Sequence, residues 1–284
     1  MYRLKEIKVE KIIETVKGLC IKAACDLPND VEALITNSLK KEESEFGRYI
    51  LEQIIDNIKL ARKENQAMCQ DTGVAVIFVE IGQDVHITGG NLISAINEGV
   101  RQGYRDGYLR NSVVDDPLFL RKNTGDNTPA VIHTEIVPGN QLKIMVVPKG
   151  AGSENMGALK MLKPVDGIEG VKEFILKTVR EAGGNPCPPI IVGVGIGGTM
   201  EKATYLAKKA LTREAGEHNP DNRYKELEIE LLKKINKLGI GPQGLGGRIT
   251  ALAVNIEAYP THIATLPVAV NLNCHAARHS KAIL

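Results

Sequence analysis

The spacing of apolar residues changes sharply near residue 69, and this change limits the folds that the chain can adopt. Before it, apolar side chains recur every three or four positions within Lys- and Glu-rich sequence, which is typical of amphipathic helices. After it, runs rich in Val and Ile alternate with further helical patterns, and the first such run is residues 74–81. The pattern predicts an α+β (mixed α/β) fold in which a helical N-terminal layer packs on a mixed β-sheet.

The same spacing predicts most element bounds. Within the helical layer, residues 1–65, Pro28 ends a first helix, Asn29 or Asp30 caps a second, and a third begins near Ser44. The apolar face of the third helix comprises Phe46, Ile50, Leu51, Ile54, Ile55 and Ile58. Later helices are expected at 91–108, 168–182, from 199, and 221–238, and later strands at 130–137, 142–147, 189–194, 249–256 and 266–272. No linker or repeat interrupts the chain, so residues 1–284 are predicted to form a single domain.

Composition and charge exclude several classes of function. Only 4% of the 284 residues are aromatic and none is Trp, so the core must be built from Ile, Val, Leu and Ala. The net charge is +2 with acids and bases interspersed, so we expect no nucleic-acid partner. The N-terminus lacks the apolar segment of a signal peptide, and no run approaches the roughly 18 apolar residues of a membrane span. We expect no membrane association and a cytoplasmic location.

Five cysteines occur along the chain, and an odd number without a signal peptide argues against a disulfide framework. Cys69, Cys187 and Cys274 lie at loop-like joints beside strands, among polar, turn-forming neighbours. Cys20, in contrast, falls on the apolar face of a helix, and Cys25 lies near the end of that helix. There is no Cys-x-x-Cys pair, so spacing alone leaves each cysteine open to being a plain core thiol.

Five motifs that flank these cysteines carry a family resemblance. They are Cys69-Gln70-Asp71-Thr72-Gly73, Lys149-Gly150-Ala151-Gly152-Ser153-Glu154-Asn155, Asn185-Pro186-Cys187-Pro188-Pro189, Gly193-Val194-Gly195-Ile196-Gly197-Gly198, and Pro260-Thr261-His262-Ile263-Ala264 leading to Asn273-Cys274-His275. Together they closely resemble the N-terminal part of class I fumarases and the α subunits of the L-tartrate dehydratase type. The resemblance runs roughly from residue 10 to the end of the chain.

The resemblance implies an iron–sulfur centre. In that family three cysteines hold a [4Fe-4S] cluster in which one iron lacks a protein ligand, and the matching positions here are Cys69, Cys187 and Cys274. An open iron can bind the substrate hydroxyl and a carboxylate oxygen as a Lewis acid, which assists the loss of hydroxide. The same open iron makes the cluster vulnerable to oxidation, so an oxygen-sensitive enzyme is expected.

Gln70 and Asp71 are the residues that the resemblance places at the substrate. Dehydration of a 2-hydroxy diacid needs a base that removes a proton from the carbon beside a carboxylate, and Asp71 lies two residues from a proposed ligand. Asp71 is therefore the candidate catalytic residue. Two alternatives stay open: Asp71 caps the following turn, because Asx-Thr-Gly suits a turn, or a partner chain supplies the base.

Arg110 is the best match for the substrate arginine of the family, because a guanidinium can hold a carboxylate with two hydrogen bonds. Alternatives for this role are Arg101, Arg105 and Arg121. Gly150 and Gly152 lie in a small-residue loop whose backbone N–H groups could bind a carboxylate, although an ordinary tight loop would have the same sequence. The family usually has glycine at position 151, and Ala151 restricts the backbone there.

His262 matches a substrate-side histidine of the family and is the third candidate contact for a carboxylate. A structural role is the alternative. His275 and His279 flank Cys274, and they could orient the cluster or lie at a solvated chain end, which we favour for His279.

Gly193, Gly195 and Gly198 satisfy the G-x-G-x-x-G pattern of dinucleotide-binding folds, and acidic residues follow near the expected distance. The pattern lies late in the chain and no clear βαβ unit precedes it. We interpret these glycines as a close-packed turn, with Thr199 capping the next helix. An NAD-dependent oxidoreductase stays open as an alternative function.

The function implied by the resemblance is a hydro-lyase that reversibly dehydrates a small 2-hydroxy dicarboxylate, either malate to fumarate or tartrate to oxaloacetate. Single-chain class I fumarases carry a second, C-terminal domain that completes the active site, whereas this sequence ends soon after Cys274. We therefore expect a separate β subunit, an α2β2 heteromer, and little activity from this chain alone. An inactive scaffold subunit is the remaining alternative.

Overall fold

The computed structural model describes residues 4–284, and its contacts group into two compact units. Unit 1 comprises the chain up to Pro28, Ile58–Ala151 and Arg278–Leu284, and unit 2 comprises Asn29–Asn57 and Gly152–Ala277. Helices and strands occur throughout both, which confirms the α+β fold class. The helical segment 1–65 is divided between the two units, and the single domain over 1–284 stays a prediction.

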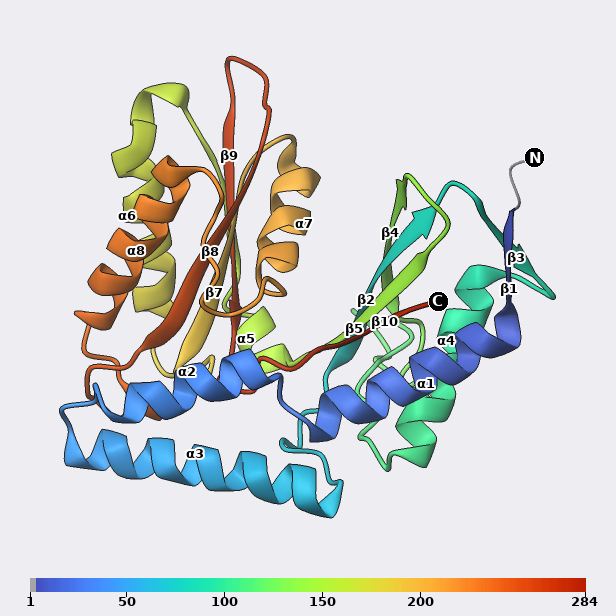
Figure 1. The fold of residues 1–284 in the computed structure, drawn as a ribbon. Coiled ribbons are helices and arrows are strands. Elements are labelled where there is room, and N and C mark those ends of the chain that lie inside the picture. The colour runs from blue at the N-terminus through green and yellow to red at the C-terminus, as the bar shows by residue number, and fades with distance from the viewer. Residues whose placement is uncertain (1–3) are drawn as a thin grey trace. The chain divides into compact units, whose positions relative to one another are not determined.

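Unit 1 is built on a four-stranded sheet with the order β10-β5-β2-β4 (Figure 1). Strand β2 (Val74–Gly82) pairs in parallel with β4 (Val131–Val137) and antiparallel with β5 (Leu142–Lys149). Strand β10 (Ser280–Ile283) pairs antiparallel with β5. The expected strands at 130–137 and 142–147 are therefore confirmed, but β2 lies between them in the sheet.

Helices α1 (Val9–Cys25) and α4 (Leu92–Asp106) pack on each other in unit 1. A Cβ atom built at Gly99 would lie 2.6 Å from the Cβ atom of Val16, so the two helices approach closely only because position 99 has no side chain. The core beneath them consists mainly of Ile, Val, Leu and Ala, as composition predicts. A small parallel pair, β1 (Lys5–Lys8) and β3 (Val85–Thr88), completes this unit.

Unit 2 contains a second four-stranded sheet with the order β6-β9-β7-β8. Its strands are β6 (Ala158–Leu162), β9 (Leu266–Asn273), β7 (Ile190–Gly197) and β8 (Ala251–Tyr259). Helices α6 (Gly167–Ala182) and α8 (Asn222–Asn236) cover one face and α7 (Met200–Ala210) covers the other (Figure 1). Every residue of β7 is buried, since helices lie on both faces of this central strand.

The remaining elements are two helices of the N-terminal layer and three short helical turns. They are α2 (Asn29–Leu39), α3 (Glu45–Glu64), α5 (Ala151–Glu154), η1 (Pro164–Asp166) and η2 (Pro242–Gly244). The predicted apolar face of α3 is confirmed at Leu51, Ile54, Ile55 and Ile58, which are buried. It is wrong at Phe46, which is 53% exposed, because this ring lies in the first turn and stacks on Tyr49 at the surface.

The glycine pattern after residue 192 is a packing feature of unit 2. Gly193 and Gly195 lie inside β7, and a Cβ atom there would lie 2.2 Å from the carbonyl oxygen of Ala207 and 2.0 Å from that of Ala203. Both oxygens belong to α7, so the two glycines allow this helix to lie directly on the sheet. The expected cap is wrong in detail, because the Thr199 hydroxyl donates to the Glu201 carboxylate instead of a backbone group.

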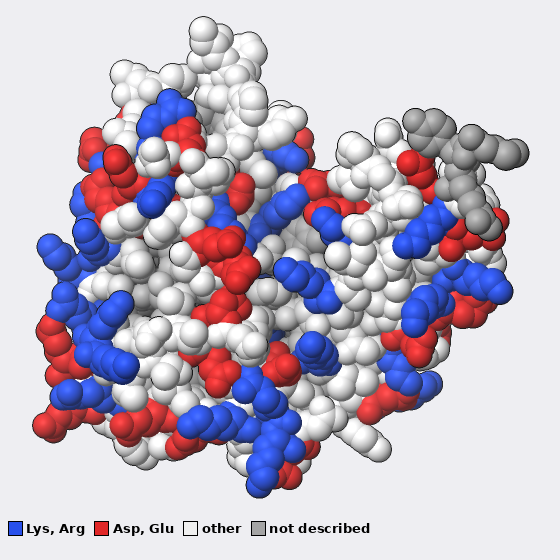
Figure 2. Space-filling view, viewed as in Figure 1, with Lys and Arg blue, Asp and Glu red and all other residues white. Residues whose placement is uncertain are grey.

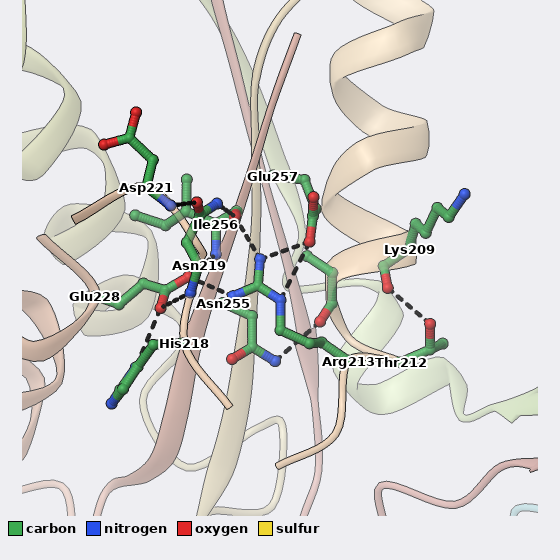
Figure 3. A network of polar contacts seen from close by, with 11 residues as sticks. Lys209, Thr212, Arg213, His218, Asn219, Asp221, Glu228, Asn255, Ile256 and Glu257 are labelled. Carbon is green, nitrogen blue, oxygen red and sulfur yellow. Dashed lines mark hydrogen bonds and ion pairs between the residues drawn. The ribbon is translucent and has the colours of Figure 1, made fainter. Parts of the chain in front are cut away.

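A buried polar network joins α8 to the edge of the same sheet (Figure 3). The Glu228 carboxylate is fully buried and accepts hydrogen bonds from Arg213 Nη1 at 2.5 Å and from the backbone N–H groups of Asn219 and Ile256 at 3.0 and 2.8 Å. His218 Nδ1 lies 3.2 Å from its second oxygen. Each oxygen of this buried carboxylate therefore has hydrogen-bond partners, as a buried polar group requires.

Acidic and basic side chains are interspersed over the face drawn in Figure 2. This distribution agrees with the even charge pattern of the sequence. Over residues 4–284, every helix is too short or too polar to cross a membrane.

Candidate functional site

The turn that follows Cys69 is held by hydrogen bonds to the Asp71 carboxylate. Asp71 Oδ1 accepts the backbone N–H of Gly73 at 3.0 Å, and Oδ2 accepts the backbone N–H of Ala151 at 2.8 Å. The first bond is the Asx turn that the sequence left open as an alternative role. The second joins the turn to the end of β5, so the Asp71 carboxylate is fixed from two directions.

Arg110 is held beside this turn through its backbone. The buried Thr72 hydroxyl donates to the Arg110 carbonyl oxygen at 2.9 Å, and Ser112 Oγ lies 3.4 Å from the same oxygen. The Arg110 side chain is exposed, which suits a group that meets a ligand. Unit 1 thus brings Asp71 and Arg110, two of the predicted substrate residues, to neighbouring positions.

Gly150 contacts the same aspartate. A Cβ atom built at this position would lie 3.3 Å from Asp71 Oδ2, which is tighter than an ordinary contact, so glycine leaves room for the carboxylate. Ala151 begins the helical turn α5, a conformation that alanine adopts readily. The departure from glycine at position 151 therefore leaves the Asp71 contact intact. Gly152 belongs to unit 2, where it is the first residue of the second segment, Gly152–Ala277.

The alternative arginines have other partners. Arg101 donates through Nε to Asp126 at 2.8 Å and pairs with Glu98, and Arg105 donates to Asp106 at 2.7 Å. Arg121 Nη1 donates to the carbonyl oxygen of Pro117. These local bonds favour Arg110 as the arginine that is available to a ligand.

In unit 2, Cys187 and Cys274 lie at the same end of the sheet. Cys187 precedes β7 and Cys274 follows β9, and these strands are antiparallel with Ile191 opposite Asn273. The start of one strand therefore meets the end of the other (Figure 1).

His275 joins these two cysteine-bearing segments. Its backbone N–H donates to the Cys187 carbonyl oxygen at 3.3 Å, and its Nδ1 lies 3.1 Å from the same oxygen. The Gln243 side chain lies 3.0 Å from that Nδ1 and donates to the Pro188 carbonyl oxygen at 3.0 Å. His275 thus orients the loop that carries Cys187.

The five cysteines fall into two groups by exposure. Cys187 is exposed and Cys69 and Cys274 are half-buried, whereas Cys20 and Cys25 are buried. Burial raises the pKa of the Cys20 thiol to about 12. Burial, together with the charge of Asp26, also raises the pKa of Cys25, although Arg278 opposes this shift. Only a thiolate binds iron, so the buried pair is poorly suited to that role.

Cys69 belongs to unit 1, and the other two accessible cysteines belong to unit 2. Each unit presents its thiols on loops that backbone hydrogen bonds fix. Within residues 4–284, no three His, Cys, Asp or Glu side chains are gathered as a metal site would require.

His262 lies at the other end of β9 from Cys274. The eight residues of β9 separate them, which corresponds to roughly 26 Å along an extended strand. His262 is exposed and lines a hollow with Thr199, Lys202 and Tyr259. Unit 2 therefore does not bring His262 to the corner that Cys187 and Cys274 occupy.

A model of the fumarate hydratase (fumerase) family matches residues 13–283. This chain belongs to the fumarate hydratase family. Among curated relatives, the putative L(+)-tartrate dehydratase subunit alpha of Methanocaldococcus jannaschii is 47% identical, covering 95% of this chain and 96% of the relative. The L(+)-tartrate dehydratase subunit alpha of Escherichia coli O157:H7 is 33% identical, covering 99% and 93%. Hydratases and dehydratases add or remove water, so membership of this family supports a hydro-lyase.

Three residues that contact the turn after Cys69 were not predicted from the sequence. Tyr104, Asn127 and Arg278 are at most 2% exposed, and each donates a hydrogen bond to a carbonyl oxygen of residues 71–73. Tyr104 falls at an apolar position of a predicted helix and therefore resembles a core residue. Arg278 and Asn127 lie outside the elements that the sequence predicts, so no periodicity singled them out.

Proposed function

We propose that this chain is the α subunit of an oxygen-sensitive, [4Fe-4S]-dependent hydro-lyase that reversibly dehydrates a small 2-hydroxy dicarboxylate. It needs a separate β subunit, with which it forms an α2β2 heteromer in the cytoplasm. The observation that carries the proposal is the division of the cysteines. The three that match the family motifs are accessible on hydrogen-bonded loops, and the two that do not match are buried.

The residues present fit an iron–sulfur cluster in their donor chemistry. Thiolates are the usual protein ligands of such clusters, and Cys69, Cys187 and Cys274 supply three. When bound, the cluster supplies one iron without a protein ligand, a Lewis acid for the substrate hydroxyl and a carboxylate oxygen. The His275 contacts to Cys187 keep two of the ligand loops together.

Asp71 is the proposed base for the carbon-bound proton. Its carboxylate uses one acceptor position on each oxygen for the N–H groups of Gly73 and Ala151, and an ionised carboxylate has about four such positions in all. The remaining positions are available for a proton, and the two amide bonds fix the direction in which they point. A base from the β subunit is the competing assignment, in which case Asp71 positions the substrate together with Gln70.

Arg110 and the glycine loop are the proposed carboxylate contacts. The exposed Arg110 guanidinium can hold one substrate carboxylate with two hydrogen bonds, while its backbone stays fixed by Thr72. Backbone N–H groups near Gly150 and Gly152 suit the second carboxylate. His262 lies far from Cys274 in unit 2, so unit 2 by itself does not bring its proposed substrate contact to these cysteines.

The substrate class follows from the names of the family and the relatives. The family is named for fumarate, and the alpha subunits from M. jannaschii and E. coli are named for tartrate. We propose malate and fumarate, or tartrate and oxaloacetate, as the reacting pairs. The two diacids differ by one hydroxyl, and direct assay of both separates them.

Anaerobic reconstitution with iron and sulfide tests the cluster. We expect about four irons per α chain and a brown protein. Cys69→Ser, Cys187→Ser and Cys274→Ser should each lower the iron content and abolish activity, whereas Cys25→Ala, a matched change at a buried cysteine, should retain both. A colourless wild-type protein after reconstitution would contradict the proposal.

Co-expression tests the need for a partner. The α chain alone should bind iron but convert diacid only slowly, and addition of the β subunit should restore turnover and give a particle with two copies of each chain. Full activity from the α chain alone would rule out the proposed division of the site.

A further inference from the structure

The turn formed by residues 71–73 is held from behind by three buried side chains. Arg278 Nη2 donates to the carbonyl oxygen of residue 71. The Tyr104 hydroxyl lies 2.8 and 3.0 Å from the carbonyl oxygens of residues 72 and 73, and Asn127 Nδ2 donates to the latter at 3.1 Å. Every main-chain acceptor of the turn thus meets a buried donor from elsewhere in unit 1.

Arg278 differs from the other two donors because it is charged. It is 2% exposed, and its Nε and Nη1 atoms are buried with no hydrogen-bond partner among residues 4–284. A buried guanidinium with so few partners costs stability that a neutral side chain would avoid. Its hydrogen bond through Nη2 ends on the main chain of Asp71, and a charged donor makes a stronger bond than a neutral one.

The sheet of unit 1 positions Arg278 beside the Asp71 carbonyl oxygen. Strand β10 begins two residues later and pairs with β5, with Ser280 opposite Val146. Strand β5 then runs on to Lys149, and the N–H of Ala151 donates to the Asp71 carboxylate. Two neighbouring strands therefore fix Asp71. Arg278, just before β10, holds its main chain, and Ala151, just after β5, holds its side chain.

We infer that Arg278 is a positioning residue, whose guanidinium holds the Asp71 main chain so that the carboxylate keeps one orientation on the Ala151 N–H. Arg278 is buried, so it acts through Asp71 and not by touching substrate. The inference rests on the proposed role of Asp71 in the hydro-lyase reaction. It adds to that role the group that keeps Asp71 aligned.

Steady-state kinetics of the assembled enzyme test this inference. Arg278→Met keeps the length and removes the donor, and it should lower kcat about 100-fold with KM within about twofold of wild type, since a misplaced catalytic group costs turnover more than binding. Arg278→Lys retains a cationic donor and should recover turnover to about tenfold below wild type. Arg223→Met, at an exposed arginine of unit 2, is the matched control and should leave kcat unchanged.

Hydrogen exchange of the full α chain gives a second measurement that needs no activity. In Arg278→Met the amides of Gly73 and Ala151 should exchange faster than in wild type, while those of the buried strand β7 stay unchanged. Arg278→Lys should lie between the two, and Arg223→Met should match wild type.

Several outcomes overturn the inference. They are wild-type kcat in folded Arg278→Met, a rise in KM equal to the fall in kcat, or unchanged exchange at Gly73 and Ala151. If Arg278→Met does not fold, Arg278→Lys decides through both measurements: faster exchange at Gly73 and Ala151 with a lower kcat at unchanged KM supports the inference, and faster exchange with a wild-type kcat contradicts it. If the wild-type enzyme converts no diacid, the proposed function fails, and the exchange measurement still tests the Arg278 contact.

Discussion

Asp71 in unit 1 and Glu228 in unit 2 both accept backbone N–H groups through their carboxylates, but their surroundings differ. Glu228 is fully buried, with Arg213 and His218 against its oxygens in addition to two amides. Asp71 is half-buried, and the partners of its carboxylate oxygens are two amides. The cation bonded to the Asp71 turn, Arg278, donates to the main chain and not to the carboxylate.

This difference separates a carboxylate that the fold uses from the carboxylate that we propose as a base. A carboxylate whose acceptor positions are all used, and whose charge a guanidinium neutralises, has nothing left for a ligand. A carboxylate that is fixed in direction but keeps acceptor positions at the surface can take a proton or a hydrogen bond from substrate. The contrast therefore predicts opposite effects of substitution on activity and on stability.

The largest expected effect is on turnover. Asp71→Asn should lower kcat of the assembled enzyme about 100- to 10,000-fold, the range for loss of a general base, while the free energy of unfolding falls by only about 1 kcal/mol through one weakened amide contact. Anaerobic assays and urea unfolding measure the two quantities. Asp84→Asn, a half-buried aspartate of the same unit, should leave both near wild type. Turnover within a few-fold of wild type would assign the base to the β subunit.

The reverse pattern is expected at Glu228. Glu228→Ala removes one of the two carboxylates that pair with Arg213, which keeps Glu257, and leaves the N–H groups of Asn219 and Ile256 without an acceptor. At about 1–3 kcal/mol for each buried donor left unpaired, the free energy of unfolding should fall by about 2–6 kcal/mol. Activity per folded molecule should stay near that of wild type. Glu226→Ala, at an exposed position of the same helix, should change stability by less than about 0.5 kcal/mol. A large loss of activity in folded Glu228→Ala would contradict the assignment of Glu228 to a purely structural role.

The glycines of β7 test whether the Gly-x-Gly pattern of unit 2 serves the packing of α7 on the sheet. In Gly195→Ala the new methyl group meets the Ala203 carbonyl oxygen, and the shift of α7 should cost about 1–3 kcal/mol. Gly18→Ala is the matched control, because nothing lies within 4 Å of that position on α1 and a helical alanine should add about 0.5–1 kcal/mol. Thermal unfolding of both variants measures these changes. A stable Gly195→Ala variant would reopen the dinucleotide-binding interpretation of these glycines.

The sequence predicted the elements whose pattern is long enough to be distinctive. Helix α1 and strand β2 repeat their periodicity over many residues, whereas β1, β3, β6 and β10 have four or five residues each, too few to establish an alternation. The order of the unit 1 sheet was also not predictable, because β4 and β5 follow each other in the chain and only tertiary packing inserts β2 between them.

Motifs identified the residues that we propose to contact substrate, and packing determined the buried residues behind them. Asp71 and Arg110 lie in segments whose neighbours resemble a known family, so the amino-acid sequence alone was enough to name them. Asn127 is buried beside that turn with a left-handed backbone (φ 60°), and its contact to Gly73 spans 54 residues. No local sequence pattern predicts such a contact, because burial of a polar side chain depends on the whole fold.

The smallest expected effect concerns the outer part of the unit 1 network, where Asp126 binds Arg101 and Thr128. Partial burial favours the neutral acid, but the hydrogen bonds from Arg101 and Thr128 outweigh it and lower the pKa of Asp126 to about 2. Because this pKa lies below the ordinary value of 3.8, the contribution of Asp126 to stability is present above about pH 4 and is lost as the pH falls toward 2.

Urea unfolding between pH 5 and pH 2.5 tests this expectation. Wild type should lose about 1 kcal/mol more than Asp126→Asn over this range, since the asparagine cannot titrate and solvent weakens the partly exposed ion pair. Glu52→Gln, at an exposed position of α3, is the control and should follow the wild-type curve. Parallel curves for wild type and Asp126→Asn would show that Asp126 does not contribute to the acid sensitivity of this unit.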